Sequence, residues 1–254
     1  MPVVSHEGAE LYYEVHGEGP AIAFAHGSGG NTLIWWQQVP HFAKSRRVLV
    51  YDHRGWGRSR CAPDALHPRH FAGDLAAILD HAGIDKIDLV CQSMGGWTGL
   101  PFALAHPGRL QRLVLCGTSG GFDTPLTAAD RARTMALWPS TPIADMVLSR
   151  GFQLRDPART HLYLRIAGLN PPDSVPTVRP LLATIRIAPE ALAGNRMPML
   201  LLSGDEDWFF KPETIADMAR RIPNARSTCL AGVGHSSYFE VPQDFNRIVG
   251  EFLG

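Results

Sequence analysis

The chain has 254 residues, enough for one large domain with a sizeable hydrophobic core or for a core with an inserted subdomain. Hydrophobic residues make up 45% of it and charged residues 19%, which is typical of a globular protein, and 24 basic side chains balance 24 acidic ones. No basic stripe or block of like charge is present, so neither a nucleic acid nor an anionic membrane is expected as a partner.

The first part of the chain alternates short apolar runs with helical patterns. A helical pattern is predicted for residues 35–43, for residues 70–81 and directly after Ser93. The apolar runs predict strands at residues 11–15, 21–25, 47–51, 87–90 and 113–116. Continuous apolar runs separated by helices predict a mostly parallel central sheet that helices cover on both faces. The fold class is therefore α/β.

The pattern changes between residues 118 and 195. No convincing buried strand occurs there, but helical periodicity extends over residues 130–138, 142–152 and 157–169, interrupted by Pro and Gly clusters. We interpret this segment as a helical insertion of roughly 75 residues, the size of a small lid.

The α/β alternation resumes after the insertion. Strands are predicted at residues 197–202 and 227–230, and helices at residues 212–221 and 242–252. The sequence therefore predicts a core domain in two parts, interrupted by a cap. The expected bounds are 1–117 for the first part of the core, 118–195 for the helical cap and 196–254 for the second part of the core.

The N-terminus, the cysteines and the histidines bear on cellular location and cofactor use. The N-terminus lacks the basic and apolar regions of a signal peptide, and no apolar run approaches the roughly 20 residues of a membrane span. The cysteines are far apart, a pattern typical of reduced, buried thiols: Cys61, Cys91, Cys116 and Cys229. We therefore expect a cytoplasmic protein. The 11 histidines are scattered without a metal-binding motif, so no metal or other cofactor is expected.

Residues that carry chemistry directly follow four of the predicted strands. They are a Gly-rich loop at residues 26–30, a turn at Ser93, an acidic loop with Asp205 and Asp207, and a loop that ends at His235. In an open parallel sheet the ligand lies at the carboxyl ends of the strands. A serine hydroxyl is a poor nucleophile at neutral pH, and it needs a base and an acid that orients the base. His235 and an aspartate supply these groups.

The turn at Ser93 joins a predicted strand to a predicted helix. Small residues two positions before and after the serine are typical of this strained turn, because neighbouring Cβ atoms would collide with the adjacent strand and helix. Gly95 fits this pattern, whereas Cys91 occupies a position where glycine is usual. The strain places the serine hydroxyl at the end of the sheet, beside the free N–H groups of a helix N-terminus. We expect Cys91 to be buried beneath the serine and not to act as a second nucleophile.

Five motifs occur in order and at suitable spacing over nearly the whole chain. They are His26-Gly27-Ser28-Gly29-Gly30, Asp52-His53-Arg54-Gly55-Trp56-Gly57-Arg58-Ser59, Cys91-Gln92-Ser93-Met94-Gly95-Gly96, Gly204-x-x-Asp207 and Gly234-His235. Together they resemble the α/β-hydrolase superfamily, and the resemblance implies a serine hydrolase with a cap. It also implies that Ser93 is the nucleophile, His235 the general base and then acid, and Asp207 the orienting acid. Asp205 and Asp123 remain alternatives for that last role.

An acyl-transfer site also needs two preorganised donors for the oxyanion. The backbone N–H groups of Met94, directly after the nucleophile, and of Ser28, in the Gly-rich loop, are the candidates. Asp52 and Arg54 are interpreted as structural residues that hold their loop in place. No direct chemistry is expected of either.

The walls of the substrate pocket are expected to be aromatic. Trp208 and Phe209 lie beside Asp207 in the sequence, and Trp138 belongs to an apolar stretch of the cap. Arg150 and Arg165 could pair with a substrate carboxylate, although solvated arginines are the more ordinary interpretation. We therefore expect a small-molecule, ester-like substrate of apolar character.

The leading hypothesis is hydrolysis of a carboxylic ester or lactone through an acyl-enzyme intermediate, without a cofactor. A first alternative is hydrolysis of a carbon–carbon bond in a vinylogous diketone, but such hydrolases usually carry Trp where this chain has Ser236. A second alternative is a slow or non-catalytic ligand-binding receptor. Haloalkane and epoxide chemistry need a carboxylate at position 93. The sequence does not decide between a monomer and a homodimer.

Overall fold

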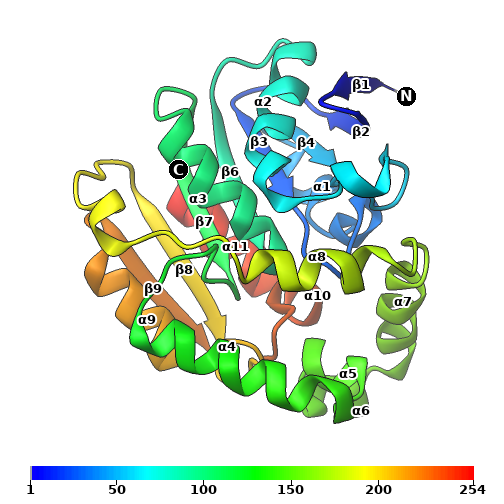
Figure 1. Cartoon of the computed structure of the whole chain (residues 1–254), viewed down its shortest axis with the longest axis vertical. Coiled ribbons are helices and arrows are strands. Elements are labelled where there is room, and N and C mark those ends of the chain that lie inside the picture. Colours follow the sequence, from blue (N-terminus) through cyan, green and yellow to red (C-terminus); the bar gives the residue numbers. More distant parts are fainter. Residues whose placement is uncertain (1) are drawn as a thin grey trace.

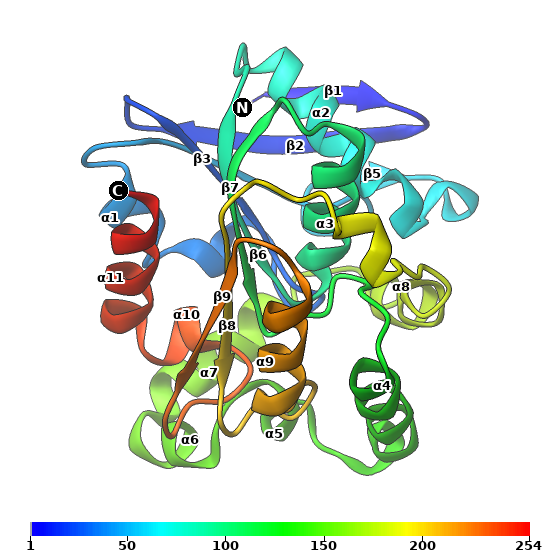
Figure 2. The same cartoon turned by 90° about the vertical axis from the view of Figure 1, so that its left-hand side faces the viewer.

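The computed structural model describes residues 2–254 and contains a nine-stranded sheet with helices on both faces (Figures 1 and 2). The strands are β1 (Val3–His6), β2 (Ala9–His16), β3 (Ala21–Ala25), β4 (Arg47–Tyr51), β5 (Arg60–Cys61), β6 (Ile87–Gln92), β7 (Leu110–Cys116), β8 (Met199–Gly204) and β9 (Ala225–Leu230). Their order is β1-β2-β4-β3-β6-β7-β8-β9, and β5 pairs with β2. All pairs from β4 to β9 are parallel, whereas the pairs that β2 makes are antiparallel. The predicted α/β class is confirmed.

The helices cover both faces of the sheet and one of its ends. The α-helices are α1 (Val39–Phe42), α2 (Phe71–His81), α3 (Gly96–Ala105), α4 (Pro125–Leu137), α5 (Ile143–Val147), α6 (Arg150–Arg155), α7 (Pro157–Ala167), α8 (Ser174–Leu182), α9 (Pro212–Arg221), α10 (Ser237–Glu240) and α11 (Pro242–Leu253). The 3-10 helices are η1 (Thr32–Trp35), η2 (Pro63–Ala65), η3 (Pro68–His70), η4 (Ser93–Gly95), η5 (Trp138–Ser140) and η6 (Pro189–Leu192). In Figure 2, α1 and α11 lie on one side of the sheet, and α2, α3 and α9 lie on the other.

Alternate residues of the central strands pack into different hydrophobic clusters. In β4, Leu49 and Tyr51 belong to the cluster that contains residues of α2, α3 and α9. Val48 and Val50 belong to the cluster with residues of α1 and α11. Successive side chains of a strand point to opposite faces. Both faces of β4 are therefore buried, which explains why its sequence is a continuous apolar run and does not alternate with polar residues.

The edges of the sheet and the segment after β3 differ from the prediction. Strands β1 and β5 were not predicted, because they are short edge strands with polar or charged residues. In place of the single helix predicted at residues 35–43, the structure has two short helices, η1 mostly before this range and α1 within it. Pro40 lies in the first turn of α1, where the missing N–H of proline is tolerated.

The segment between β7 and β8 contains helices α4 to α8, which lie together at the end of the sheet toward which β8 points (Figure 1). The helix predicted at residues 142–152 is interrupted at Leu148, whose backbone is extended, and Ser149 caps the next helix by accepting the N–H of Phe152. Helix α8 was not predicted, because Pro176 and Pro180 lie within it. Pro176 lies in the first turn, but Pro180 lies inside the helix and removes one backbone hydrogen bond, so this helix depends on its packing.

A buried ion pair holds the loop after β4. Arg54 is fully buried and donates to both carboxylate oxygens of Asp74 on α2, which is 2% exposed. Arg54 also donates to the backbone oxygens of Ala65 at 2.9 Å and Glu7 at 3.3 Å. These contacts confirm the structural interpretation of Arg54.

We expect Asp74→Ala to lower the free energy of unfolding by about 3–5 kcal/mol, because the substitution leaves the Arg54 charge buried without its partner. Asp80→Ala is the matched control, since Asp80 is 67% exposed in its pair with Arg109. Loss of an exposed pair costs less than about 1 kcal/mol. Urea unfolding measures both variants, and equal losses would contradict the structural role of Arg54.

No helix within residues 2–254 is long and apolar enough to cross a membrane, and no three potential ligands among these residues are grouped around a metal-sized site. All four cysteines are free; Cys91 and Cys116 are buried, Cys61 is half-buried and Cys229 is exposed. The prediction of buried thiols is wrong for Cys61 and Cys229, because both lie on strands at the edge of the sheet.

Candidate active site

Ser93 lies at the turn between β6 and α3. Its φ angle is +49°, in the left-handed region that non-glycine residues rarely adopt. Such strain costs on the order of 1–3 kcal/mol and tends to occur at functional sites. A Cβ at Gly95 would collide with the backbone oxygen of Ala25 on β3, so the turn packs tightly against the neighbouring strand. The small residue predicted at this position is therefore required by close packing.

Cys91 is accommodated beneath this turn. It is fully buried in β6, and a Cβ at Gly99 on α3 would lie 2.6 Å from its sulfur. The missing side chain of Gly99 thus leaves room for a cysteine where glycine is usual. Burial raises the pKa of the Cys91 thiol. Because the thiolate is the nucleophilic form, burial disfavours a nucleophilic role for this cysteine.

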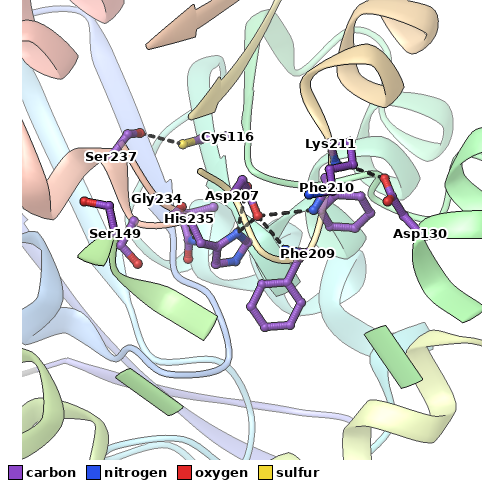
Figure 3. Close-up of polar contacts among 12 residues, drawn as sticks. Cys116, Asp130, Ser149, Asp207, Phe209, Phe210, Lys211, Gly234, His235 and Ser237 are labelled. Carbon is purple, nitrogen blue, oxygen red and sulfur yellow. Dashed lines mark hydrogen bonds and ion pairs between the residues drawn. The ribbon is translucent and has the colours of Figure 1, made fainter. Parts of the chain in front are cut away.

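His235 and Asp207 meet at the carboxyl ends of β9 and β8 (Figure 3). Nδ1 of His235 lies 3.0 and 2.9 Å from the two carboxylate oxygens of Asp207, and both side chains are buried. The carboxylate also accepts the backbone N–H groups of Phe209 at 2.8 Å and Phe210 at 3.2 Å. Nε2 of His235 is buried and has no hydrogen-bond partner among residues 2–254. The imidazole is therefore fixed at one nitrogen and unpaired at the other.

The two other candidate acids have different partners. Asp205 is exposed and accepts the backbone N–H groups of Gly232 at 2.7 Å and Val233 at 3.3 Å. Asp123 forms ion pairs with two arginines at 3.4 and 3.6 Å. Of the three acids considered, the structure brings Asp207 to His235.

The Ser93 turn and the His235 loop are adjacent. Gln92 donates its side-chain N–H to the backbone oxygen of His235 at 3.4 Å. A Cβ at Gly27 would lie 2.9 Å from Cβ of Ser93, so the Gly-rich loop also contacts the turn. No hydrogen bond joins Ser93 to His235 in the described part of the chain. Catalytic hydrogen bonds are often long without substrate and shorten when substrate binds.

Ser28, Ser93 and Met94 line one cavity of about 310 Å³. The indole N–H of Trp56 donates to the backbone oxygen of Ser28 at 2.8 Å, and this hydrogen bond restrains the Ser28 peptide. This role of Trp56 was not predicted, although the residue lies in one of the five motifs. The contact fixes the orientation of the loop that carries the Ser28 N–H.

Aromatic side chains form part of the cavity wall. Trp138 and Phe209 line the cavity, and the Phe209 ring lies 4.4 Å from the His235 ring between centroids. Trp208 is not among the lining residues; it packs against Trp138 and Phe209, with ring centroids 6.2 and 4.9 Å away. Val178 and other residues of α8 complete the wall. These wall residues were not predicted, because α8 was not predicted.

A buried carboxylate joins the His235 loop to the segment between β7 and β8. Glu240 is 3% exposed and accepts the backbone N–H of Gly234 at 3.1 Å. It also accepts the backbone N–H of Ser149 at 3.1 Å and its hydroxyl at 2.6 Å. Burial raises the pKa of Glu240. This side chain, which the sequence analysis missed, couples the position of His235 to the N-cap of α6.

Residues 20–242 match the model of the alpha/beta hydrolase fold family. The chain belongs to this family. A relative from Azorhizobium caulinodans, provisionally named carbamate hydrolase RutD, is 29% identical over 100% of this chain and 98% of its own. A 2-hydroxymuconate semialdehyde hydrolase from Pseudomonas sp. strain CF600 is 32% identical over 93% of this chain and 88% of its own. A solved thermophilic esterase from Thermogutta terrifontis has a TM-score of 0.84 and 26% identity, covering 96% and 93% of the two chains. These similarities support a hydrolase that acts on a small molecule.

In this alpha/beta hydrolase His26, which follows β3, and His53, which follows β4, form a buried histidine pair. Nε2 of His26 accepts the backbone N–H of His53 at 3.0 Å. Asp52 accepts the backbone N–H groups of Thr32 at 2.6 Å and Arg58 at 2.8 Å, which confirms its structural interpretation. Burial lowers the pKa of both His26 and His53.

The histidine pair predicts a loss of stability in mild acid. The unfolded histidines have a pKa of about 6.5, so below that pH the unfolded chain binds more protons than the folded chain. We therefore expect the free energy of unfolding to be insensitive to these groups above about pH 6.5 and to decrease as the pH falls below it. His53→Gln removes one of the two groups and should reduce this slope between about pH 7 and 5. Urea unfolding at several pH values measures the slope, and an unchanged slope in the variant would count against the role of the pair.

Proposed function

We propose that this hydrolase cleaves a carboxylic ester or lactone through an acyl-enzyme intermediate, with Ser93, His235 and Asp207 as its catalytic triad. The observation that carries the proposal is the buried imidazole, which contacts Asp207 at Nδ1 and has no protein partner at Nε2 within residues 2–254. A carboxylate at Nδ1 favours the tautomer that has its proton there, so Nε2 is the basic nitrogen. The adjacent strained turn supplies the serine.

The reaction begins with attack of Ser93 Oγ on the carbonyl carbon, while Nε2 of His235 takes the hydroxyl proton. The oxyanion accepts hydrogen bonds from the backbone N–H groups of Ser28 and Met94. His235 then gives its proton to the leaving alkoxide, and Ser93 is left acylated. Water, deprotonated by His235, attacks this ester, releases the acid and restores the serine.

We also propose that residues 118–195 act as a cap over a core formed by residues 1–117 and 196–254. The cavity supports this division, because Trp138 and Val178 line it from the segment between β7 and β8. Ser28 and Ser93 line it from the other side. The substrate would therefore lie between the cap and the carboxyl ends of the strands, where ligands of open parallel sheets bind.

Two other reactions compete with this proposal. Carbon–carbon bond hydrolysis of a vinylogous diketone is the second candidate from the sequence, and the relative named carbamate hydrolase RutD adds carbamate hydrolysis. The test is a turnover panel for the wild-type protein that contains short and long acyl esters, lactones, a carbamate and a vinylogous diketone.

We expect an ester or lactone to give the highest kcat/KM in this panel, above about 10⁴ M⁻¹s⁻¹ for a well-matched substrate. Faster turnover of the diketone or the carbamate would overturn the assignment. A protein that binds panel members tightly but turns over none of them would be a receptor.

A further inference from the structure

The cavity that contains Ser93 is mostly apolar but carries two positive charges. Its wall includes Trp97, Met94 and Leu182, and its ionisable lining residues are Arg131 and Arg179. No aspartate, glutamate, lysine or histidine of residues 2–254 is among the lining residues. The chain as a whole has zero formal net charge, so this cavity concentrates positive charge in a neutral protein.

Arg179 projects from α8 without an acidic partner. Its guanidinium carbon lies 4.5 Å from the centroid of the Trp138 ring, and it makes no hydrogen bond or ion pair with any residue from 2 to 254. Stacking on an indole face holds a guanidinium in place but leaves its charge and its N–H donors available. Arg179 is exposed, so its charge and N–H donors are accessible to a bound anion.

Arg131 projects from α4 and is only partly neutralised. One of its nitrogens lies 3.4 Å from the carboxylate of Asp123, which is 40% exposed. The same carboxylate oxygen lies 3.6 Å from Arg186, so two guanidinium groups share one acid. This group of three side chains keeps a net positive charge at the cavity.

We propose that Arg131 and Arg179 bind a carboxylate of the substrate, so that the ester or lactone hydrolysed here carries an anionic group away from the scissile bond. The inference rests on the proposed function and names its substrate class. Guanidinium groups match carboxylates in geometry, and charge-assisted hydrogen bonds are stronger than those between neutral groups. The remote carboxylate takes no part in the reaction, in which water and the ester give an acid and an alcohol.

This substrate differs from the apolar one expected from the sequence, and the arginines differ as well. Arg150 and Arg165, which the sequence analysis considered as carboxylate partners, do not line the cavity. The helix that carries Arg179 was not predicted. The apolar wall instead accounts for the part of the substrate between its carboxylate and its scissile bond.

The test compares 4-nitrophenyl half-esters of succinate, glutarate and adipate with the corresponding neutral methyl diesters. We expect wild-type kcat/KM to favour at least one anionic substrate over its neutral partner by about tenfold or more, mainly through KM, because the interaction is the same in the ground state and the transition state. Arg179→Gln and Arg131→Gln should each reduce this ratio by about tenfold. Arg165 is exposed and lies outside the cavity wall, so Arg165→Gln should preserve the ratio. A wild-type preference for every neutral diester, or an unchanged ratio in both cavity variants, would overturn the inference.

Binding to Ser93→Ala separates this inference from the proposed function. Calorimetric titration of that variant with the preferred half-ester and with its neutral diester measures recognition without turnover. Tighter binding of the half-ester, weakened about tenfold by adding Arg179→Gln, would support the anion site even if the wild-type reaction is not ester hydrolysis. Equal binding of the two compounds would refute the anion site even if ester turnover is observed.

Discussion

Ser93→Ala should lower kcat for the best ester or lactone substrate by at least about 10⁴-fold, because it removes the nucleophile that forms the acyl-enzyme. Binding should persist, since the cavity wall and both oxyanion donors remain. Steady-state kinetics on the purified variant measures the loss, and circular dichroism checks that the variant is folded.

Ser119→Ala is the matched control for this experiment, because Ser119 is another serine that lines the same cavity. We expect its kcat to stay within about tenfold of the wild-type value, since this hydroxyl has no part in the proposed chemistry. A Ser93→Ala variant that retains more than a tenth of wild-type turnover would exclude Ser93 as the nucleophile.

Asp207→Asn should lower kcat by about 10⁴-fold with little change in the fold. The amide has nearly the same shape as the carboxylate, but its NH₂ group favours the wrong tautomer of His235. It also cannot stabilise the imidazolium that forms during the reaction. The kinetic loss should therefore lie in kcat and not in KM.

Asp205→Asn and Asp123→Asn are the controls for the orienting acid. Asp205 accepts two backbone N–H groups in an exposed turn, and an asparagine side chain can accept them as well. Both control variants should retain activity within about tenfold of wild type. Loss of turnover in either control together with near-normal turnover in Asp207→Asn would reverse the assignment.

The central part of the fold follows from local patterns in the sequence. Strands buried on both faces are continuous apolar runs, so β3, β4, β6, β7 and β8 are easily predicted. The edge strands β1 and β5 lack that pattern, because one side of each faces solvent. Helix α8 contains Pro176 and Pro180 and is stabilised by packing, for which the sequence gives no local signal.

In the candidate site, too, local sequence patterns predict some residues and not others. Ser93, Asp207 and His235 could be named in advance because each follows a strand in a motif with defined spacing. Glu240 and Arg179 could not be named in advance, because the roles proposed for them depend on contacts between segments far apart in the sequence. Glu240 reaches Ser149, and Arg179 stacks on Trp138 from an unpredicted helix. Sequence motifs therefore predict the proposed reacting groups more readily than the residues proposed to position them or to select the substrate.

Covalent labelling tests the central claim most directly. A fluorophosphonate reacts with a serine only when a base activates it, so the label reports the nucleophile without knowledge of the natural substrate. Incubation of the wild-type protein, followed by intact mass measurement and peptide mapping, should show one label per chain on Ser93, in parallel with loss of ester turnover. The Ser93→Ala variant should remain unlabelled. A label on another residue, or continued ester turnover in fully labelled protein, would contradict the assignment of Ser93 as the nucleophile.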